Sequence, residues 1–279
     1  MTTHTYVTTV LAVATLLLTL GSASTGTAPG KPDIPLPESI KRAGKLRFAA
    51  DFTSPPLQYY DANHNMIGID VDLCGSIAEH LGVKAEWVNL TFHSLIPALN
   101  AGRFDAICTE MFITPERAKA VAFVPYMQTG QSIVVSKGNP RNVRRLEDIC
   151  GLRAGLQLGT VEEVTVRQQT KACEAKKKPA VDIKTFNYAA DAVLQVLNGR
   201  ADFWMADDPE AAYYAKTTPN KVDIAVAGIN PTLDGIGVSP RNYLLAGAIT
   251  AAFYAMKLDG SYHTIMLKWN IFADELGFF

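Results

Sequence analysis

The chain carries almost no net charge and few residues of the types that bind metals. Its 279 residues include 26 basic and 27 acidic side chains, which give a formal net charge of −1, and no basic face is visible in the sequence. Nucleic acid is therefore not expected as a partner, because its recognition relies on clustered Lys and Arg. The five histidines and four cysteines form no spacing typical of a zinc site. We expect neither a metal nor another cofactor.

Recognisable catalytic motifs are also missing. The sequence contains no GxSxG nucleophile elbow, no HExxH pair and no glycine-rich phosphate loop. Its composition, with 48% hydrophobic and 19% charged residues, is ordinary for a soluble globular protein. These absences favour a binding protein over an enzyme.

One long apolar run is present, and it lies at the N-terminus. Val10–Leu20 has the length of a signal-peptide core and is followed by mostly small residues. We predict a signal peptide over residues 1–28; the alternatives are an uncleaved anchor or a wrongly assigned start. Residues 29–38 are Pro-rich and predict an extended lead-in. Export would place the protein in the periplasm, or outside the cell if the source lacks an outer membrane.

The four cysteines fall into two pairs with different surroundings. Cys150 and Cys173 flank a predicted strand and helix in a polar region, so we expect a disulfide between them in an exported protein. Cys74 and Cys108 lie in apolar periodic segments. There the favoured interpretation is buried thiols that pack as small hydrophobic groups.

Extended and helical patterns alternate along the chain. Strands are predicted at residues 45–50, 83–88 and 104–108, with one helix that ends at Gly82 and another that ends at Gly102 between them. This alternation is typical of a largely parallel sheet with helices on both faces. The fold class is therefore α/β.

A short motif recurs about a hundred residues apart. LNAGRFD occupies residues 99–105, and LNGRAD occupies residues 197–202. Each copy follows an apolar helix and leads into a hydrophobic strand that ends in acidic residues. The recurrence predicts two similar Rossmann-like lobes.

Two β-branched strands are the natural connections between these lobes. They lie at residues 131–135 and 235–239, on either side of the second motif. A later helix then returns to the first lobe, which makes that lobe discontinuous. We expect a two-strand hinge, with residues 39–130 plus 233–279 in the first lobe and 131–232 in the second.

The segment Leu95–Tyr126 is suited to hold a small acid. It reads as helix, glycine turn, buried strand, polar loop and a second helix that begins at Thr114. A loop at the carboxyl end of a strand, capped by a helix N-terminus, favours an anion. Arg117 adds a planar, permanently charged group that suits a carboxylate.

These features together resemble the family 3 extracellular solute-binding proteins. The similarity covers about residues 40 to 272 and rests on motifs in matching order: LRFAAD, GIDVDL, ITPERAKAVAFVPY, GLQLGTVEE, LNGRADFWMADDP and AMKLDGSYHTI. The resemblance implies a two-lobed, type II periplasmic binding protein that closes over its ligand by hinge motion. It also implies a monomer that delivers a polar amino acid to an inner-membrane ABC permease.

The resemblance assigns roles to particular residues. Arg117 matches the arginine that pairs with the α-carboxylate of the ligand, and Asp207 matches the aspartate that holds its α-ammonium group. Asp51 matches a polar position that lines the site, and Phe92 matches one that stacks on the ligand. The remaining positions lie on two loops that complete the site: Thr109, Glu110, Phe112, Gly159, Thr160 and Glu162.

Two departures from the family pattern concern the ligand. Glu110 and Phe112 stand where a small hydroxyl residue or glycine is common, and MFITPER resembles the variant in ectoine-binding members. Phe92 and Phe112 could form a partial cation–π cage, to which the carboxylates add negative charge. The sequence therefore favours a cationic or zwitterionic ligand: a basic amino acid, an opine-like derivative or a cyclic compatible solute such as ectoine.

Two other functions stay open at this point. Cyclohexadienyl dehydratases resemble these receptors and use a carboxyl group as general acid, a role for which Glu210 is placed. A sensor ectodomain is the third hypothesis, but the chain shows no transmembrane or signalling segment of the kind that it needs.

Overall fold

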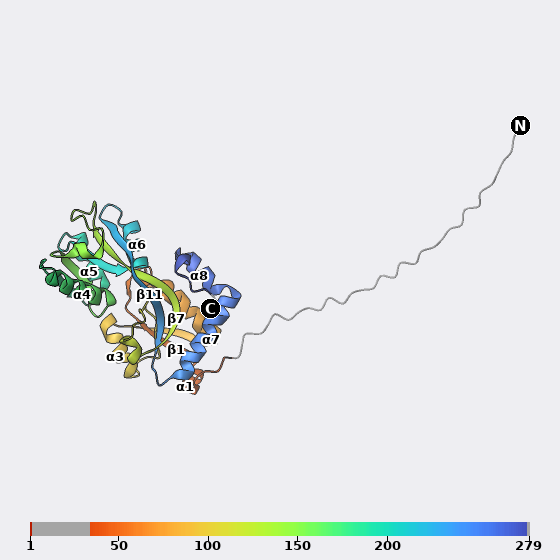
Figure 1. Ribbon diagram of the computed structural model, residues 1–279. Coiled ribbons are helices and arrows are strands. Elements are labelled where there is room, and N and C mark those ends of the chain that lie inside the picture. Colours follow the sequence, from red (N-terminus) through yellow and green to blue (C-terminus); the bar gives the residue numbers. More distant parts are fainter. Residues whose placement is uncertain (2–33, 278–279) are drawn as a thin grey trace. The chain divides into compact units, whose positions relative to one another are not determined.

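One eight-stranded sheet organises the computed structural model, which describes residue 1 and residues 34–277 (Figure 1). Residues 2–28 of the predicted signal peptide and residues 29–33 of the lead-in lie outside these residues. The strands follow the order β5-β1-β6-β11-β7-β10-β8-β9. Their bounds are β1 (Lys45–Ala50), β5 (Lys84–Asn89), β6 (Ala106–Ile107), β7 (Ala122–Ser136), β8 (Arg153–Gln157), β9 (Asp182–Phe186), β10 (Phe203–Asp207) and β11 (Val222–Val238).

Each end of this sheet is parallel, whereas its middle is antiparallel. β1 pairs in parallel with β5 and β6, and β8 pairs in parallel with β9 and β10. The long strands β7 and β11 pair with each other in antiparallel fashion and join the two parallel groups (Figure 1). A separate three-stranded sheet contains β2 (Thr53–Ser54), β3 (Gln58–Tyr60) and β4 (Met66–Ile67).

Helices connect the strands of each parallel group, as expected for an α/β fold. The α-helices are α1 (Glu38–Ala43), α2 (Ile69–His80), α3 (Leu95–Asn100), α4 (Val161–Ala175), α5 (Ala189–Leu197), α6 (Asp208–Thr217), α7 (Tyr243–Asp259) and α8 (Ser261–Trp269). Single 3₁₀ turns are η1 (Phe92–Ser94), η2 (Arg117–Lys119), η3 (Leu146–Ile149) and η4 (Phe272–Asp274). Among the described residues, no helix combines the length and apolar character needed to cross a membrane.

The helix predicted to begin at Thr114 is wrong. Only the 3₁₀ turn η2 forms there, and the Thr114 hydroxyl accepts a hydrogen bond from Arg117 N at 3.1 Å. The chain has little room for a longer helix, because β7 already begins at Ala122 and pairs with β11 from its first residue.

The buried apolar residues form four clusters that follow the two parallel groups. Two clusters pack β1, β6, α2, α3 and α7 around side chains such as Phe48, Leu73 and Ile249. The other two pack β8, β10, α4 and α5 around side chains such as Leu156 and Trp204. Burial of apolar area within each cluster is the main favourable term in folding.

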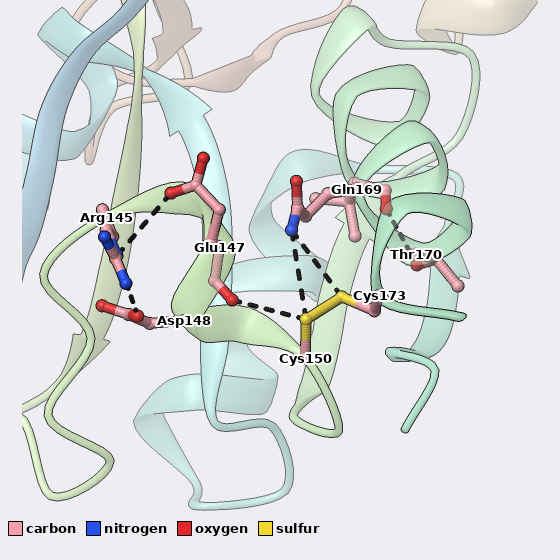
Figure 2. The surroundings of a disulfide bond; sticks show 8 residues. Arg145, Glu147, Asp148, Cys150, Gln169, Thr170 and Cys173 are labelled. Atoms are coloured by element: carbon pink, nitrogen blue, oxygen red, sulfur yellow. Dashed lines mark hydrogen bonds and ion pairs between the residues drawn. A yellow bond between two sulfur atoms is a disulfide. The ribbon is translucent and has the colours of Figure 1, made fainter. Parts of the chain in front are cut away.

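Both cysteine pairs form disulfides. Cys150 is joined to Cys173, where the Gln169 amide nitrogen lies 3.7 Å from the Cys173 sulfur (Figure 2). Cys74 is joined to Cys108, so the expectation of free thiols there is wrong. Both of these side chains are buried, and the pair links α2 to the end of β6. The two segments are 34 residues apart, and only the packing of α2 on the sheet brings them together.

Candidate ligand-binding site

A cavity of about 30 Å³ lies at the carboxyl ends of β1, β6, β8 and β10. This is the position where parallel α/β sheets bind ligands, because the loops and helix N-termini of neighbouring strands meet there. Eight of the residues predicted for the site line the cavity: Phe92, Thr109, Glu110, Phe112, Arg117, Thr160, Glu162 and Asp207. The other two predicted residues, Asp51 and Gly159, lie behind this lining.

Three hydrogen bonds hold the two walls of the cavity together. Gln157 Nε2 donates to Asp51 Oδ2 at 2.7 Å, and Ala189 N donates to Thr53 Oγ1 at 3.2 Å. Arg117 Nη2 donates to Gly159 O at 3.2 Å. Each bond joins a residue of the β1–β6 group to a residue of the β8–β10 group. The structure is therefore closed around the cavity.

The close approach of the two walls requires a glycine at position 159. Its φ is +84°, and a Cβ atom added there would lie 2.9 Å from His93 Cβ. Any other residue would have to adopt a strained backbone and push the two walls apart. The loop that contains Gly159 thus contributes to the site through the close approach of its backbone to His93 and through the carbonyl group of Gly159.

Asp51 joins the two walls of the cavity by accepting hydrogen bonds from three donors. Its carboxylate accepts from Thr53 Oγ1, Phe92 N and Gln157 Nε2 at 2.8, 3.2 and 2.7 Å. Burial raises the pKa of Asp51 to about 6, while these hydrogen bonds act in the opposite direction. Asp51 therefore fastens the closed walls from behind the cavity.

Arg117 is the single basic side chain among the described residues that line the cavity. Nη1 donates to Phe112 O at 2.9 Å, and the guanidinium carbon lies 5.2 Å from the centre of the Phe92 ring. The ring of Phe92 is therefore engaged with Arg117 in this closed form. Such stacking fixes the plane of the guanidinium group and favours bidentate pairing with a carboxylate.

Four carboxyl groups line the cavity together with this one guanidinium. Glu110 comes from the loop after β6, Glu162 from the N-terminus of α4, and Asp207 and Glu210 from the β10–α6 junction. Five of their oxygens have no hydrogen-bond partner among the described residues: Glu110 Oε1 and Oε2, Glu162 Oε1, Asp207 Oδ1 and Glu210 Oε1. Glu162 lies close enough to Asp207 for its charge to raise the pKa of Asp207. Buried polar atoms are normally paired, so this cluster is built for positively charged donors.

Burial and mutual repulsion raise the pKa values of this cluster. The pKa values of Glu110, Asp207 and Glu210 lie well above the ordinary carboxyl range, first because of burial. Repulsion by Asp207 raises the pKa of Glu110 further. Repulsion by Glu162 raises the pKa values of Asp207 and Glu210 further. A cation among them reverses this effect, because it stabilises the ionised forms. No three His, Cys, Asp or Glu groups in the described part of the chain are arranged to hold a metal ion.

Several lining residues were not assigned to the binding site from the sequence. Glu210, considered only as a possible catalytic acid, lies three residues after Asp207 and thus on the same face of the first turn of α6. Gln157 is the last residue of β8, which pairs with β10. Its position at the carboxyl edge of the sheet could have indicated that it belongs to the site. The others are Ser54, Leu57, Gln58, Val161, Ala189, Trp204, Met205 and Ala206.

This fold and site belong to a known class of binding proteins. The α/β architecture with two lobes and a ligand cavity is that of the periplasmic binding proteins. Residues 46–272 match the bacterial extracellular solute-binding proteins, family 3, and the chain belongs to this family.

Similar proteins share most of the length of the chain. ABC transporter arginine-binding protein 1 of Escherichia coli (strain K12) is 29% identical over 233 residues, which make up 81% of this chain and 91% of that protein. An ancestral arginine-binding protein, solved with bound arginine, is 37% identical with a TM-score of 0.76 and covers 81% of this chain and 98% of its own. An ancestral amino acid-binding protein described as a precursor of cyclohexadienyl dehydratase is 34% identical with a TM-score of 0.76, over 83% and 98% of the two chains.

Proposed function

We propose that this protein is the solute-binding component of an amino-acid ABC importer and that its ligand is a basic amino acid. The observation that carries this proposal is the composition of the cavity, which is lined by four carboxyl groups and one guanidinium. An α-carboxylate pairs with Arg117. The α-ammonium group and a cationic side chain then supply the donors that the unpartnered carboxylate oxygens lack. The relatives named as arginine-binding proteins support this choice.

The lobes open to admit this ligand. A cavity of about 30 Å³ has room for about one water molecule, far less than an amino acid fills. The four core clusters support a first lobe of residues 39–130 plus 233–279 and a second of 131–232. The strands β7 and β11 are then the hinge. The Asp208 carboxylate accepts from the Ser132 hydroxyl and from Gly228 N, which ties the two hinge strands together.

The cellular setting follows from the family. We propose that residues 1–28 are a cleaved signal peptide and that the mature chain works as a monomer in the periplasm, where it docks on an inner-membrane permease. In a source without an outer membrane it is secreted or held at the cell surface.

An enzyme on the same fold is the second candidate, and the charge of the cavity disfavours it. The relative described as a dehydratase precursor and the placement of Glu210 in the cavity are the observations in its favour. However, a substrate such as prephenate carries two carboxylates and brings no positively charged donor for the unpartnered carboxyl oxygens of the cavity. We therefore propose that the chain is a receptor and not an enzyme.

A ligand screen tests this function directly. We expect arginine, lysine and ornithine to raise the melting temperature of the purified protein by several degrees, because binding stabilises only the folded state. Glutamate and aspartate should give no shift. Opines, betaines and ectoine belong in the same screen, since a larger shift with one of them would reassign the ligand. Loss of prephenate or arogenate absorbance on incubation would overturn the receptor function.

The pH dependence gives a further prediction. Ligand-free Glu110, Asp207 and Glu210 have raised pKa values, and a cationic ligand binds their ionised forms. Binding therefore releases protons, and affinity for arginine should fall about tenfold or more from pH 8 to pH 5.

The stability of the ligand-free protein should change with pH in the opposite direction. Its buried carboxyls hold more protons than the unfolded chain above pH 4, so their contribution to its stability falls as pH rises. Calorimetry and thermal melts at both pH values check the two signs; affinity that rises on acidification would contradict this prediction.

A further inference from the structure

Glu110 has an unusual backbone for a residue that lines the cavity. Its φ is +43°, in the left-handed region, which costs free energy for a residue with a side chain. Its side chain is buried and contributes two of the unpartnered oxygens in the cavity. The direction of this carboxylate thus depends on a conformation that Glu110 does not favour by itself. Something in the surrounding structure must hold it.

Two side chains outside the cavity hold this backbone. The Tyr126 hydroxyl accepts a hydrogen bond from Glu110 N at 3.0 Å and donates one to Asp70 Oδ1 at 2.6 Å. Tyr126 lies on β7 and Asp70 in the first turn of α2, and both are fully buried. Neither lines the cavity. The disulfide between Cys74 and Cys108 fastens the next turn of α2 to the residue that follows β6, two residues before Glu110.

The rest of the loop is held in another way. Ile113 N donates to Leu233 O at 2.8 Å, and Gly235 N donates to Met111 O at 3.1 Å. These bonds to β11 fix the chain on the C-terminal side of Glu110. The amide of Glu110 is bonded to the Tyr126 hydroxyl instead, and it also lies close enough to the Asp70 carboxylate to lower the pKa of that group.

We propose that Tyr126, held by Asp70, is a positioning residue for ligand charge recognition: it keeps Glu110 in the left-handed conformation and so aims its carboxylate at the cationic part of the ligand. This inference rests on the proposed function, because it takes the ligand of the cavity to be cationic. Tyr126 itself touches neither the cavity nor the ligand. Its effect on binding must therefore pass through Glu110.

The test compares two tyrosines with matched surroundings. Tyr262 OH donates to Tyr126 O at 2.6 Å and accepts from Leu276 N at 3.0 Å, so it is as buried and as fully bonded as Tyr126 OH. We expect Tyr126→Phe to lower arginine affinity about tenfold, the equivalent of one lost buried hydrogen bond. Tyr262→Phe should change it less than about twofold, although both variants lower the melting temperature. Equal effects of the two variants on affinity would overturn the proposal.

A double-mutant cycle separates positioning from packing. Glycine adopts a positive φ freely and has no carboxylate to aim, so Glu110→Gly removes the need for Tyr126. In that background Tyr126→Phe should change arginine affinity less than about twofold. A tenfold loss that persists in the Glu110→Gly background contradicts the proposal. If Tyr126→Phe does not fold, Asp70→Asn takes its place in the cycle, with an expected loss of about threefold that disappears in the same background.

A ligand-free measurement keeps the two hypotheses apart. The backbone ¹³C chemical shifts of Glu110 report its φ. They should leave the left-handed range in Tyr126→Phe and stay there in Tyr262→Phe. If the wild-type protein binds no cationic amino acid, the proposed function fails while these shifts still decide the positioning role. Unchanged Glu110 shifts in Tyr126→Phe would overturn the positioning role whatever the ligand is.

Discussion

Asp207→Asn lowers the affinity of the protein for arginine by about 100-fold, or about 3 kcal/mol. Asparagine keeps the shape of the side chain and one acceptor oxygen, so the change removes little except the negative charge. In the proposed complex that charge faces a ligand ammonium group in the cavity, where a desolvated ion pair is worth far more than at the surface. Isothermal titration calorimetry at pH 8 measures the loss.

The neighbouring aspartate is the matched control for this change. Asp208 lies one residue further along, but its carboxylate bonds the Ser132 hydroxyl and Gly228 N in the hinge and does not line the cavity. Asp208→Asn keeps an acceptor for both donors, so we expect affinity to stay within about fivefold of the wild type. A larger loss from Asp208→Asn than from Asp207→Asn would show that the wrong aspartate has been assigned to the ligand.

Local sequence patterns were enough to predict several strands of this fold. The strand expected at residues 45–50 is β1 to the residue, and Gly44 and Asp51 bound the run on either side. The strands expected at 131–135 and 235–239 turn out to be the ends of two much longer strands. Their full length was hidden because polar residues such as Thr129 and Asp234, which are unusual inside a buried strand, bond each other across the pair.

The features missed in the sequence depend on contacts between distant segments. Cys74 and Cys108 meet only because α2 packs over the end of β6, which no spacing along the chain reveals. The same holds for the chain of bonds from Asp70 through Tyr126 to Glu110, which joins three elements. Gln157 and Trp204 line the cavity together with residues of the β1–β6 group that lie far from them in the sequence. By contrast, Arg117 could be named in advance because the Thr114 hydroxyl and η2 fix it within a single local motif.

Replacement of Arg117 should have the second large effect on the affinity for arginine. Arg117→Ala should lower the affinity for arginine about 100-fold, because the α-carboxylate of the ligand loses its only cationic partner among the residues that line the cavity. Arg117→Lys should recover a part of this loss, since lysine restores the charge without the planar pair of donors. Calorimetry on both variants measures these affinities, with the melting temperature of each ligand-free protein as a check on folding.

A second ligand shows whether the loss of affinity in Arg117→Ala comes from lost pairing with the ligand carboxylate or from weaker closure of the lobes. Arg117 also donates to Phe112 O and Gly159 O, so Arg117→Ala removes one of the bonds that hold the closed walls together. Agmatine is arginine without its carboxylate, and it keeps the cationic groups that face Glu110 and Asp207. If Arg117 pairs with the carboxylate, Arg117→Ala weakens arginine about 100-fold and agmatine by less than about fivefold, because only arginine loses a partner. An equal loss for both ligands would assign Arg117 to closure of the lobes and leave the ligand carboxylate to the backbone amides at the N-terminus of α4.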